Sequence, residues 1–389
     1  MDLIIKNGTL CDFSGERQAD ILIREGLIAQ IAPTISQQGV ETLDAEGLHI
    51  LPAMVDLCIQ PKNYTRSHLQ QLQAKAISGG VGAILLSPKS DCYHYEFLNT
   101  LCENVLFPYD IQPIIDNQLQ NIAILHKSGG RALSFDSSLD SHTLQSLYQY
   151  AQMLQIPCLA HHDDNLSAVM TASPLSYELG LSANAPIMQT LDFVRISEMA
   201  LFYQVPTLLH LIHEKRILEI TQNHPFLIKE ISIHHLICNE EQYRTYDPYT
   251  KLSPPLSTKQ TQEFFRSHID EIDILTSRHT EFLPHQKEQV FQDALAGIDC
   301  LSFYFALAYT HLVKTQCISL AKLSQITSYR PAQLINLNMG EINIGRQSNL
   351  IVVDLNQQIQ INQQGPYKHQ TLYGAIQAYV SNTNGLMRL

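Results

Sequence analysis

The sequence predicts an α/β fold, a TIM-type (β/α)8 barrel with a small β-sandwich-like domain formed by both termini. In the middle of the chain, short apolar runs alternate with longer amphipathic stretches, as parallel strands alternate with helices. The two ends instead alternate apolar and polar residues like half-buried antiparallel strands, with Asn-Gly and Glu-Gly turn signals. A length of 389 residues accommodates both parts.

The predicted barrel strands lie at 51–59, 80–87, 111–115, 131–135, 156–161, 205–212, 228–235 and 271–277. Helices are expected between most of them, for example at 141–154 and 257–268. We place the first part of the β domain at 1–50, the barrel at 51–338 and the return to the β domain at 339–389. A doubly wound open sheet is the alternative that this pattern leaves open.

Bulk composition excludes several classes of protein. Hydrophobic residues make up 45% and charged residues 16%, which is typical of a packed globular protein. The net charge of -12, without a block of lysines or arginines, argues against nucleic acid or an anionic membrane as partner. The start lacks the pattern of a signal peptide, and no apolar run reaches membrane-spanning length. Eight scattered cysteines without a CxxC pair suggest reduced thiols, so we expect a cytoplasmic protein.

Ordered motifs run along nearly the whole chain, namely LDAEGLHILPAMVDL, SGGVGAILLSP, LAHHDDNL, HLIHEKRILEI, IHHLICNEE, KLSPPLS, IDILTSRHTEF and GEINIGRQSNLIVVD. Together they resemble the dihydroorotase family of the amidohydrolase superfamily. The resemblance implies one or two divalent metals at the C-terminal mouth of the barrel, and hydrolysis or closure of a cyclic amide. Such an ion lowers the pKa of a bound water and polarises the carbonyl.

The resemblance implies metal ligands on the first and fourth strands, and this sequence departs from the pattern on both. The first strand should carry a His-x-His pair, but Cys58 and Gln60 stand there. Taken alone, Cys58 is more typical of a small buried apolar residue than of a ligand. The fourth strand should carry a lysine or aspartate, and Phe135 occupies the matching position. Asp136 is a weak substitute, because a shift of one residue turns its side chain to the other face.

On the later strands the resemblance keeps His161 and His213 as ligands. His210, at an odd spacing from His213 along an apolar strand, is expected to pack outside against a helix. Arg278 replaces the aspartate that should act as ligand and general base, and His279 beside it is the remnant of an Asp-His pair. A permanent cation there repels a metal ion and accepts no proton.

The implied substrate contacts also differ. Lys62 replaces an arginine that would hold a carboxylate through two hydrogen bonds, and Lys89 and Ser253 each replace an asparagine. We interpret the HHDD run at 161–164 as a hydrogen-bonded loop at the barrel mouth. His234 and His235 are expected to be structural polar groups on the seventh strand. The site as a whole is therefore predicted to be vestigial, with no catalytic residue, metal or other cofactor.

The resemblance points most closely to a catalytically inactive dihydroorotase homologue, a pseudoenzyme of pyrimidine biosynthesis. It implies a partner, the catalytic chain of aspartate carbamoyltransferase, which such homologues hold in a larger, often dodecameric, complex. We also expect self-association. One alternative is an active cyclic amidohydrolase, a dihydroorotase or an allantoinase- or hydantoinase-like enzyme, with zinc held by Cys58, His161, His213 and, as a further candidate, Asp136. Another is a regulatory barrel that binds an anion through Lys62, Lys89 and Arg278.

Overall fold

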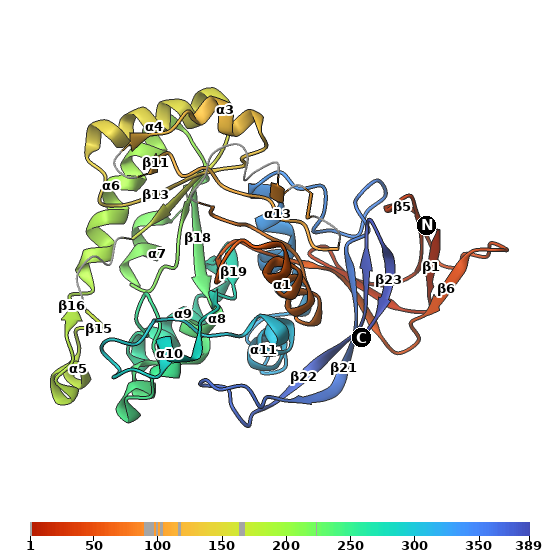
Figure 1. Cartoon of the computed structure of the whole chain (residues 1–389). Coiled ribbons are helices and arrows are strands. Elements are labelled where there is room, and N and C mark those ends of the chain that lie inside the picture. The colour runs from red at the N-terminus through yellow and green to blue at the C-terminus, as the bar shows by residue number, and fades with distance from the viewer. Residues whose placement is uncertain are drawn as a thin grey trace.

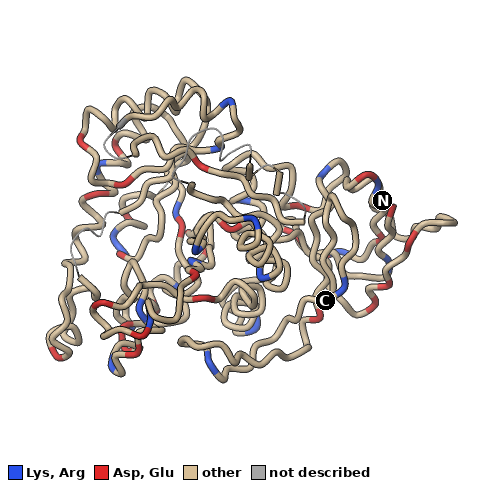
Figure 2. Tube along the Cα trace, in the orientation of Figure 1, with Lys and Arg blue, Asp and Glu red and all other residues tan. Residues whose placement is uncertain are grey.

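The chain forms a barrel and, beside it, a β domain that contains both termini (Figure 1). The computed structural model describes residues 2–88, 97–98, 100–101, 104–115, 118–162, 168–222 and 224–389. Lys89 and the two aspartates at 163 and 164 lie outside these residues. Acidic and basic positions are interspersed along the trace (Figure 2). Among the described helices, none is both long enough and apolar enough to cross a bilayer.

The barrel is built from parallel strands: β8 (Met54–Asp56), β10 (Val81–Ile84), β13 (Leu133–Asp136), β14 (Cys158–His161), β17 (Thr207–Leu209), β18 (Leu227–Ser232) and β19 (Ile274–Thr276). Five of them form one sheet in the order β13-β14-β17-β18-β19. The Ser277 amide donates to Asp56 Oδ2 at 3.1 Å, which joins the end of β19 to the end of β8. The predicted barrel is confirmed, and the open-sheet alternative is wrong.

The third barrel position differs from the prediction of 111–115. Isolated parallel bridges at Leu106, Tyr109 and Ile111 fill it instead. Immediately afterwards β11 (Ile114–Ile115) pairs antiparallel with β12 (Gln118–Leu119). Pro113 separates the two arrangements, and because proline has no amide hydrogen it cannot continue a strand ladder.

The described α-helices of this part are α1 (Arg66–Ser78), α3 (Ile122–Lys127), α4 (Ser141–Leu154), α5 (Pro174–Leu179), α6 (Ile187–Tyr203), α7 (Arg216–Thr221), α8 (Ile233–Ile237), α9 (Lys259–Ser267), α10 (Pro284–Lys287), α11 (Tyr304–Ala308), α12 (Leu320–Ser324) and α13 (Arg330–Leu334). The predicted helix at 141–154 is confirmed. It begins after Asp140, whose carboxylate accepts the amides of His142 and Thr143. The helix predicted at 257–268 spans α9, and Thr258 caps it by accepting the Thr261 amide.

Two sheets form the β domain. One has the order β5-β4-β1-β6, from β1 (Leu3–Lys6), β4 (Asp20–Arg24), β5 (Leu27–Ala32) and β6 (Glu41–Asp44). The other has the order β23-β22-β21-β7-β2-β3, from β2 (Thr9–Asp12), β3 (Gly15–Gln18), β7 (His49–Pro52), β21 (Leu350–Gln360), β22 (Thr371–Ser381) and β23 (Gly385–Arg388). Alternation along β21 places Leu350 and Val352 in the core of this domain and Ile351 and Val353 in the barrel core. The sheet therefore connects the two cores.

Candidate functional site

Three potential metal ligands meet inside the barrel. Cys58 follows β8, His210 follows β17 directly, and Glu230 lies on the neighbouring strand β18. Their donor atoms all lie within 4.8 Å of one another. The β17–β18 register, which pairs Leu209 with Lys229, places the next two residues, His210 and Glu230, side by side. His210 Nδ1 contacts Glu230 Oε2 as an ion pair, and both side chains are buried.

A second histidine lies against this cluster. The rings of His161 and His210 stack with centroids 4.2 Å apart and an interplanar angle of 21°. Burial lowers the pKa of His161 well below its usual value, and the positive charges of His210 and Arg278 lower it further. Burial would also lower the pKa of His210, but the Glu230 carboxylate, together with the Cys58 side chain, outweighs it and raises that pKa to about 10. At neutral pH the stack therefore pairs a neutral ring with a charged one.

The prediction that His210 packs outside the barrel is wrong. The prediction assumed that His210 and His213 lie on one strand and so point to opposite faces. The strand β17 ends at Leu209, however, and the chain turns at Leu211, whose φ is 54°. His213 is buried elsewhere, where its amide donates to Gln189 Oε1 at 2.9 Å and its ring centroid lies 6.0 Å from that of His235. His161 therefore meets His210 rather than His213.

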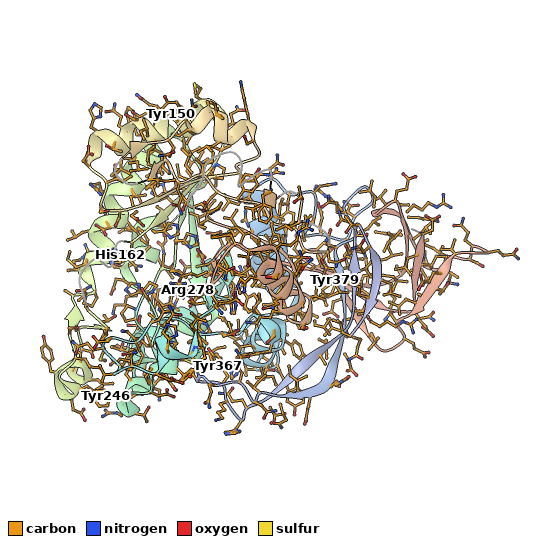
Figure 3. The ribbon with its side chains drawn as sticks, viewed as in Figure 1. Tyr150, His162, Tyr246, Arg278, Tyr367 and Tyr379 are labelled. Carbon is orange, nitrogen blue, oxygen red and sulfur yellow. The ribbon has the colours of Figure 1, made fainter. Side chains whose placement is uncertain are left out.

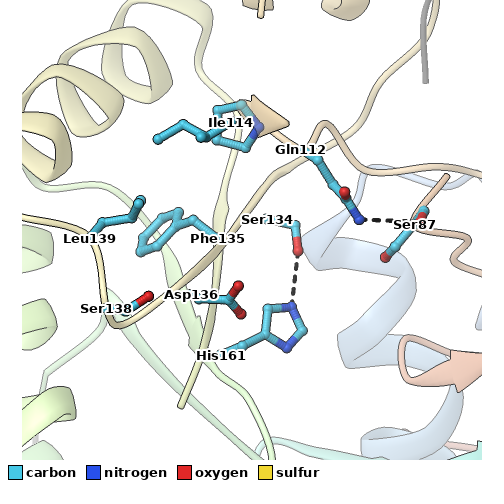
Figure 4. Close-up of a pocket in the computed structure, with 10 residues that line it drawn as sticks. Ser87, Gln112, Ile114, Ser134, Phe135, Asp136, Ser138, Leu139 and His161 are labelled. Carbon is cyan, nitrogen blue, oxygen red and sulfur yellow. Dashed lines mark hydrogen bonds between the residues drawn. The ribbon is translucent and has the colours of Figure 1, made fainter. Parts of the chain in front are cut away.

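The fourth strand presents Ser134 and Asp136 toward His161 (Figure 4). Ser134 Oγ forms a hydrogen bond with His161 Nε2 at 2.9 Å. Phe135, on the opposite face of the strand, packs edge-on against Tyr148 of α4, with ring centroids 6.0 Å apart. The assignment of Phe135 to the interior ligand position is therefore wrong. Ser134 and Asp136 both lie on the face toward His161, so Asp136 is not turned away from the interior as expected.

In space, Arg278 lies near the middle of the barrel (Figure 3). It follows β19 with a φ of 48°; its Nε donates to the Ser253 carbonyl at 2.9 Å and its Nη1 to Thr280 Oγ1 at 3.1 Å. Ser253 therefore contacts Arg278 with its backbone carbonyl oxygen. Lys62 is exposed, and its backbone amide donates a hydrogen bond to Glu281 Oε2 at 3.4 Å.

Two further predicted positions belong to a strand pair at the mouth. β9 (Ile59–Gln60) runs parallel to β20 (His279–Thr280), and the Gln60 side chain is exposed. His279 is buried, and its Nδ1 accepts the Cys300 amide at 3.2 Å and lies 3.3 Å from Asp299 Oδ1. Burial lowers the pKa of His279 to about 4, so its ring is neutral at pH 7.

The histidine pair expected on the seventh strand lies in α8 instead, because β18 ends at Ser232. His235 Nδ1 is 2.8 Å from Ser232 Oγ, and its Nε2 is 3.2 Å from the Pro255 carbonyl. His234 Nδ1 is 2.6 Å from the Tyr367 hydroxyl. Burial lowers the pKa of both rings, that of His235 to about 3. Both are neutral, hydrogen-bonded side chains.

A cavity of about 510 Å³ is lined in part by His161, whose ring stacks on that of His210 (Figure 4). Its described lining consists of Ser87, Gln112, Pro113, Ile114, Ser134, Phe135, Asp136, Ser138, Leu139 and His161. This lining contains no lysine or arginine. The described lining therefore offers hydroxyl, amide, carboxylate and imidazole groups to a small polar molecule.

No protein-family model matches the sequence. The chain is 28% identical over 386 residues to a probable dihydroorotase-like protein of Helicobacter pylori strain J99, covering 97% of this chain and 96% of that one. It is 26% identical over 390 residues to the dihydroorotase of Carboxydothermus hydrogenoformans, and the match covers 91% of this chain and 89% of that one. Over nearly its whole length, the chain is therefore similar to dihydroorotase-like proteins and dihydroorotases.

The chain also superposes on solved structures over nearly its whole length. It superposes on a D-hydantoinase with a TM-score of 0.82 at 20% identity, covering 100% of this chain and 95% of that one. It superposes on the L-hydantoinase (dihydropyrimidinase) of Arthrobacter aurescens with a TM-score of 0.86 at 17% identity. That match covers 99% of this chain and 95% of the other. These matches show the barrel and the β-sandwich domain from the termini over the whole chain.

The metal centre implied by the dihydroorotase resemblance does not fit the residues present. Gln60 is exposed, the Ser134 hydroxyl bonds to His161 Nε2, and Arg278 brings a cation to the end of the eighth strand. The described side chains that do converge are those of Cys58, His210 and Glu230.

Sequence reasoning assigned no role to Glu230 and placed His210 elsewhere. A signal for Glu230 was present, because it is a carboxylate within the apolar strand segment "IKEIS". A charge on such a strand is seldom fully buried without a partner, and Glu230 is 0% exposed.

Proposed function

We propose that this dihydroorotase-like chain is a non-catalytic subunit of pyrimidine biosynthesis that stabilises aspartate carbamoyltransferase in a cytoplasmic hetero-oligomer. The observation that carries the absence of catalysis is Arg278, whose guanidinium stands where the resemblance implies a general base. Arginine remains protonated, so it can neither take a proton from water nor bind a metal ion. Loss of a general base alone typically costs about 10²–10⁴-fold in rate.

An apolar surface on α6 supports the scaffold part of the proposal. Ile187, Leu191, Val194 and Phe202 follow one face of the helix with exposed fractions of 43%, 58%, 39% and 79%. Ile187, Leu191 and Val194 form one exposed apolar group, and Phe202 lies beyond Glu198 on the same face. Exposed apolar groups on one helix face commonly mark a protein interface. A scaffolding subunit requires such a surface, whereas a monomeric hydrolase does not.

Turnover is the first test. The purified chain is assayed with dihydroorotate and with carbamoyl aspartate, with zinc supplied and a known dihydroorotase as positive control. We expect no turnover in either direction. The Arg278→Asp variant is also expected to remain inactive, because Gln60 and Ser134 would still replace two implied ligands. A wild-type rate near that of the control would overturn the proposal.

Assembly is tested separately. The chain is mixed with the catalytic chain of aspartate carbamoyltransferase and followed by size-exclusion chromatography with light scattering. We expect a hetero-oligomer that the double variant Leu191→Asp/Phe202→Asp fails to form. Ile344→Asp is the matched control, since Ile344 is 61% exposed but lies outside α6. Separate elution of the two wild-type proteins would contradict the scaffold role.

An active cyclic amidohydrolase is the second candidate, and one observation favours it. Cys58, His210 and Glu230 supply three ligand atoms, the number typical of a catalytic zinc site with an open position for water. The same turnover assay separates the two candidates, with dihydropyrimidine, hydantoin and allantoin added as substrates.

A further inference from the structure

We infer that the base of the barrel, at the end opposite the mouth, binds a small organic anion with an apolar body. A cavity of about 570 Å³, the base cavity, lies between α13 and the first residues of β14, β17, β18 and β19. His161 and His210 lie at the other ends of β14 and β17. The base cavity is therefore separate from the candidate functional site. The inference goes beyond the proposed function, because binding here requires neither turnover nor a partner protein.

Apolar groups form a preformed part of the base cavity. Pro157 and Pro206 each come directly before a barrel strand, and Leu227 and Ile274 are the first residues of β18 and β19. Because the proline ring fixes φ, the two proline walls are in place before a ligand arrives. Concave, largely preformed cavities of about 300–1,000 Å³ with apolar walls are typical of sites for small organic molecules. The base cavity has the size and the walls of such a site.

The charge around the base cavity is opposite in sign to that of the whole chain. Its described lining contains Lys229 and Arg330 as permanent cations and Asp273 as the one carboxylate. The whole chain carries a net charge of -12, so this local excess of positive charge runs against the composition. A cavity lined by charge of one sign concentrates small ions of the opposite sign. The charge therefore favours an anionic ligand.

Arg330 offers donors that the protein leaves open. Its Nη2 lies 4.0 Å from Asp273 Oδ1, which is longer than a hydrogen bond, and its side chain donates to no other described residue. Asp273 is already engaged by Lys229, because its Oδ2 accepts the Lys229 amide at 3.0 Å and lies 3.2 Å from Lys229 Nζ. A planar guanidinium matches two oxygens of a carboxylate or a phosphate. An anion can therefore bind Arg330 while Asp273 remains paired with Lys229.

The two parts of the lining together select the class of ligand. Inorganic phosphate would contact Arg330 but leave the apolar walls unfilled. A neutral aromatic molecule would fill the walls but leave the guanidinium donors without an acceptor. A ring system that carries a carboxylate or a phosphate satisfies both parts. Carboxamides of Gln155, Gln333 and Asn336 complete the polar side of the lining and can bind further polar substituents.

Four probes added to the full chain test the inference by calorimetry and by the shift in Tm. 1-Naphthoate and 1-naphthyl phosphate carry a ring system and an anion, 1-naphthamide keeps the rings without the charge, and inorganic phosphate keeps the charge without the rings. We expect about one molecule of each aromatic anion to bind per chain and to raise the Tm. The other two probes should bind about 10–100-fold more weakly, the range of a hydrogen bond to a charged group. The tighter of the two aromatic anions identifies the anionic group that the site prefers.

Arg330→Gln should weaken the binding of both aromatic anions about 10–100-fold. The Arg330 side chain is 47% exposed, so this variant is expected to fold. Arg244→Gln is the matched control, because the Arg244 side chain is 44% exposed and pairs with Glu178 and Glu241 instead. Arg278→Met removes the cation at the mouth and should also leave binding unchanged.

Four results would overturn the inference. They are the absence of binding by both aromatic anions, equally tight binding of 1-naphthamide, binding that Arg330→Gln leaves unchanged, and binding that Arg278→Met abolishes. Turnover and assembly with aspartate carbamoyltransferase are measured without these probes, so failure of the proposed function is distinguishable from failure of the inference.

Discussion

His210 Nδ1 faces Glu230 Oε2 inside the barrel, and the exposed fractions of the two side chains are 2% and 0%. The pair is desolvated, so each charge depends on the other for compensation. The arrangement results from two neighbouring parallel strands that deliver these residues at the same level.

Glu230→Gln should destabilise the protein by up to about 3–5 kcal/mol, because it removes one partner of a buried ion pair; burial then lowers the pKa of His210, whose ring loses its proton. Urea unfolding with excess chelator measures the effect. Lys259→Ala is the control, since Lys259 and Glu263 form an exposed pair at 3.9 Å. Exposed pairs contribute about 0–1 kcal/mol, so a similar loss in both variants would contradict the account.

Stability should fall as pH rises above neutrality. His210 has a folded pKa of about 10, above the ordinary value of 6.5, so the folded state holds a proton that the unfolded state releases. Its contribution is complete below pH 6.5 and decreases through pH 10, by up to about 1.4 kcal/mol per pH unit. Urea unfolding of metal-free protein from pH 6.5 to 9 tests this slope. Glu230→Gln should flatten it, and an equal slope in both proteins would show that the pair does not titrate as described.

Acid should destabilise the fold through His279. Burial lowers its folded pKa to about 4, so between pH 6.5 and about 4 the unfolded state binds the additional proton. This contribution is present above pH 6.5 and decreases by up to about 1.4 kcal/mol per pH unit as pH falls. His279→Asn retains an acceptor but cannot titrate, so its stability should depend less steeply on pH in this range. Identical acid slopes for the two proteins would contradict the assignment.

Removal of the Arg278 charge should raise the pKa of His161. Arg278 is one of three causes that lower this pKa, after burial and the neighbouring His210. Arg278→Met keeps most of the side-chain length while removing the cation. Histidine resonances followed by NMR against pH would report the shift, with Arg244→Met as control because Arg244 forms surface pairs with Glu178 and Glu241. An unchanged His161 titration in Arg278→Met would show that the guanidinium does not act on that ring.

Local sequence predicted the fold well where its signals depend on neighbouring residues. The helix at 141–154 has an Asp140 cap and an amphipathic pattern, so both its ends could be located. The third strand was misplaced because an apolar run continues through Ile115, although Pro113 interrupts the ladder. Apolar character alone does not distinguish a barrel strand from the hairpin that follows it.

The sequence by itself determined the barrel, the joining of both termini into one domain, and Arg278 at the end of the last barrel strand. Tertiary structure decided which histidine meets His161. Alternation along a strand predicts the direction of a side chain only while the strand continues, and β17 stops at Leu209. Beyond that residue, the neighbouring strand β18 places Glu230 beside His210, and the attraction of opposite buried charges holds the ring in the interior. No spacing within the chain could reveal that contact, because it joins residues brought together only when the barrel closes.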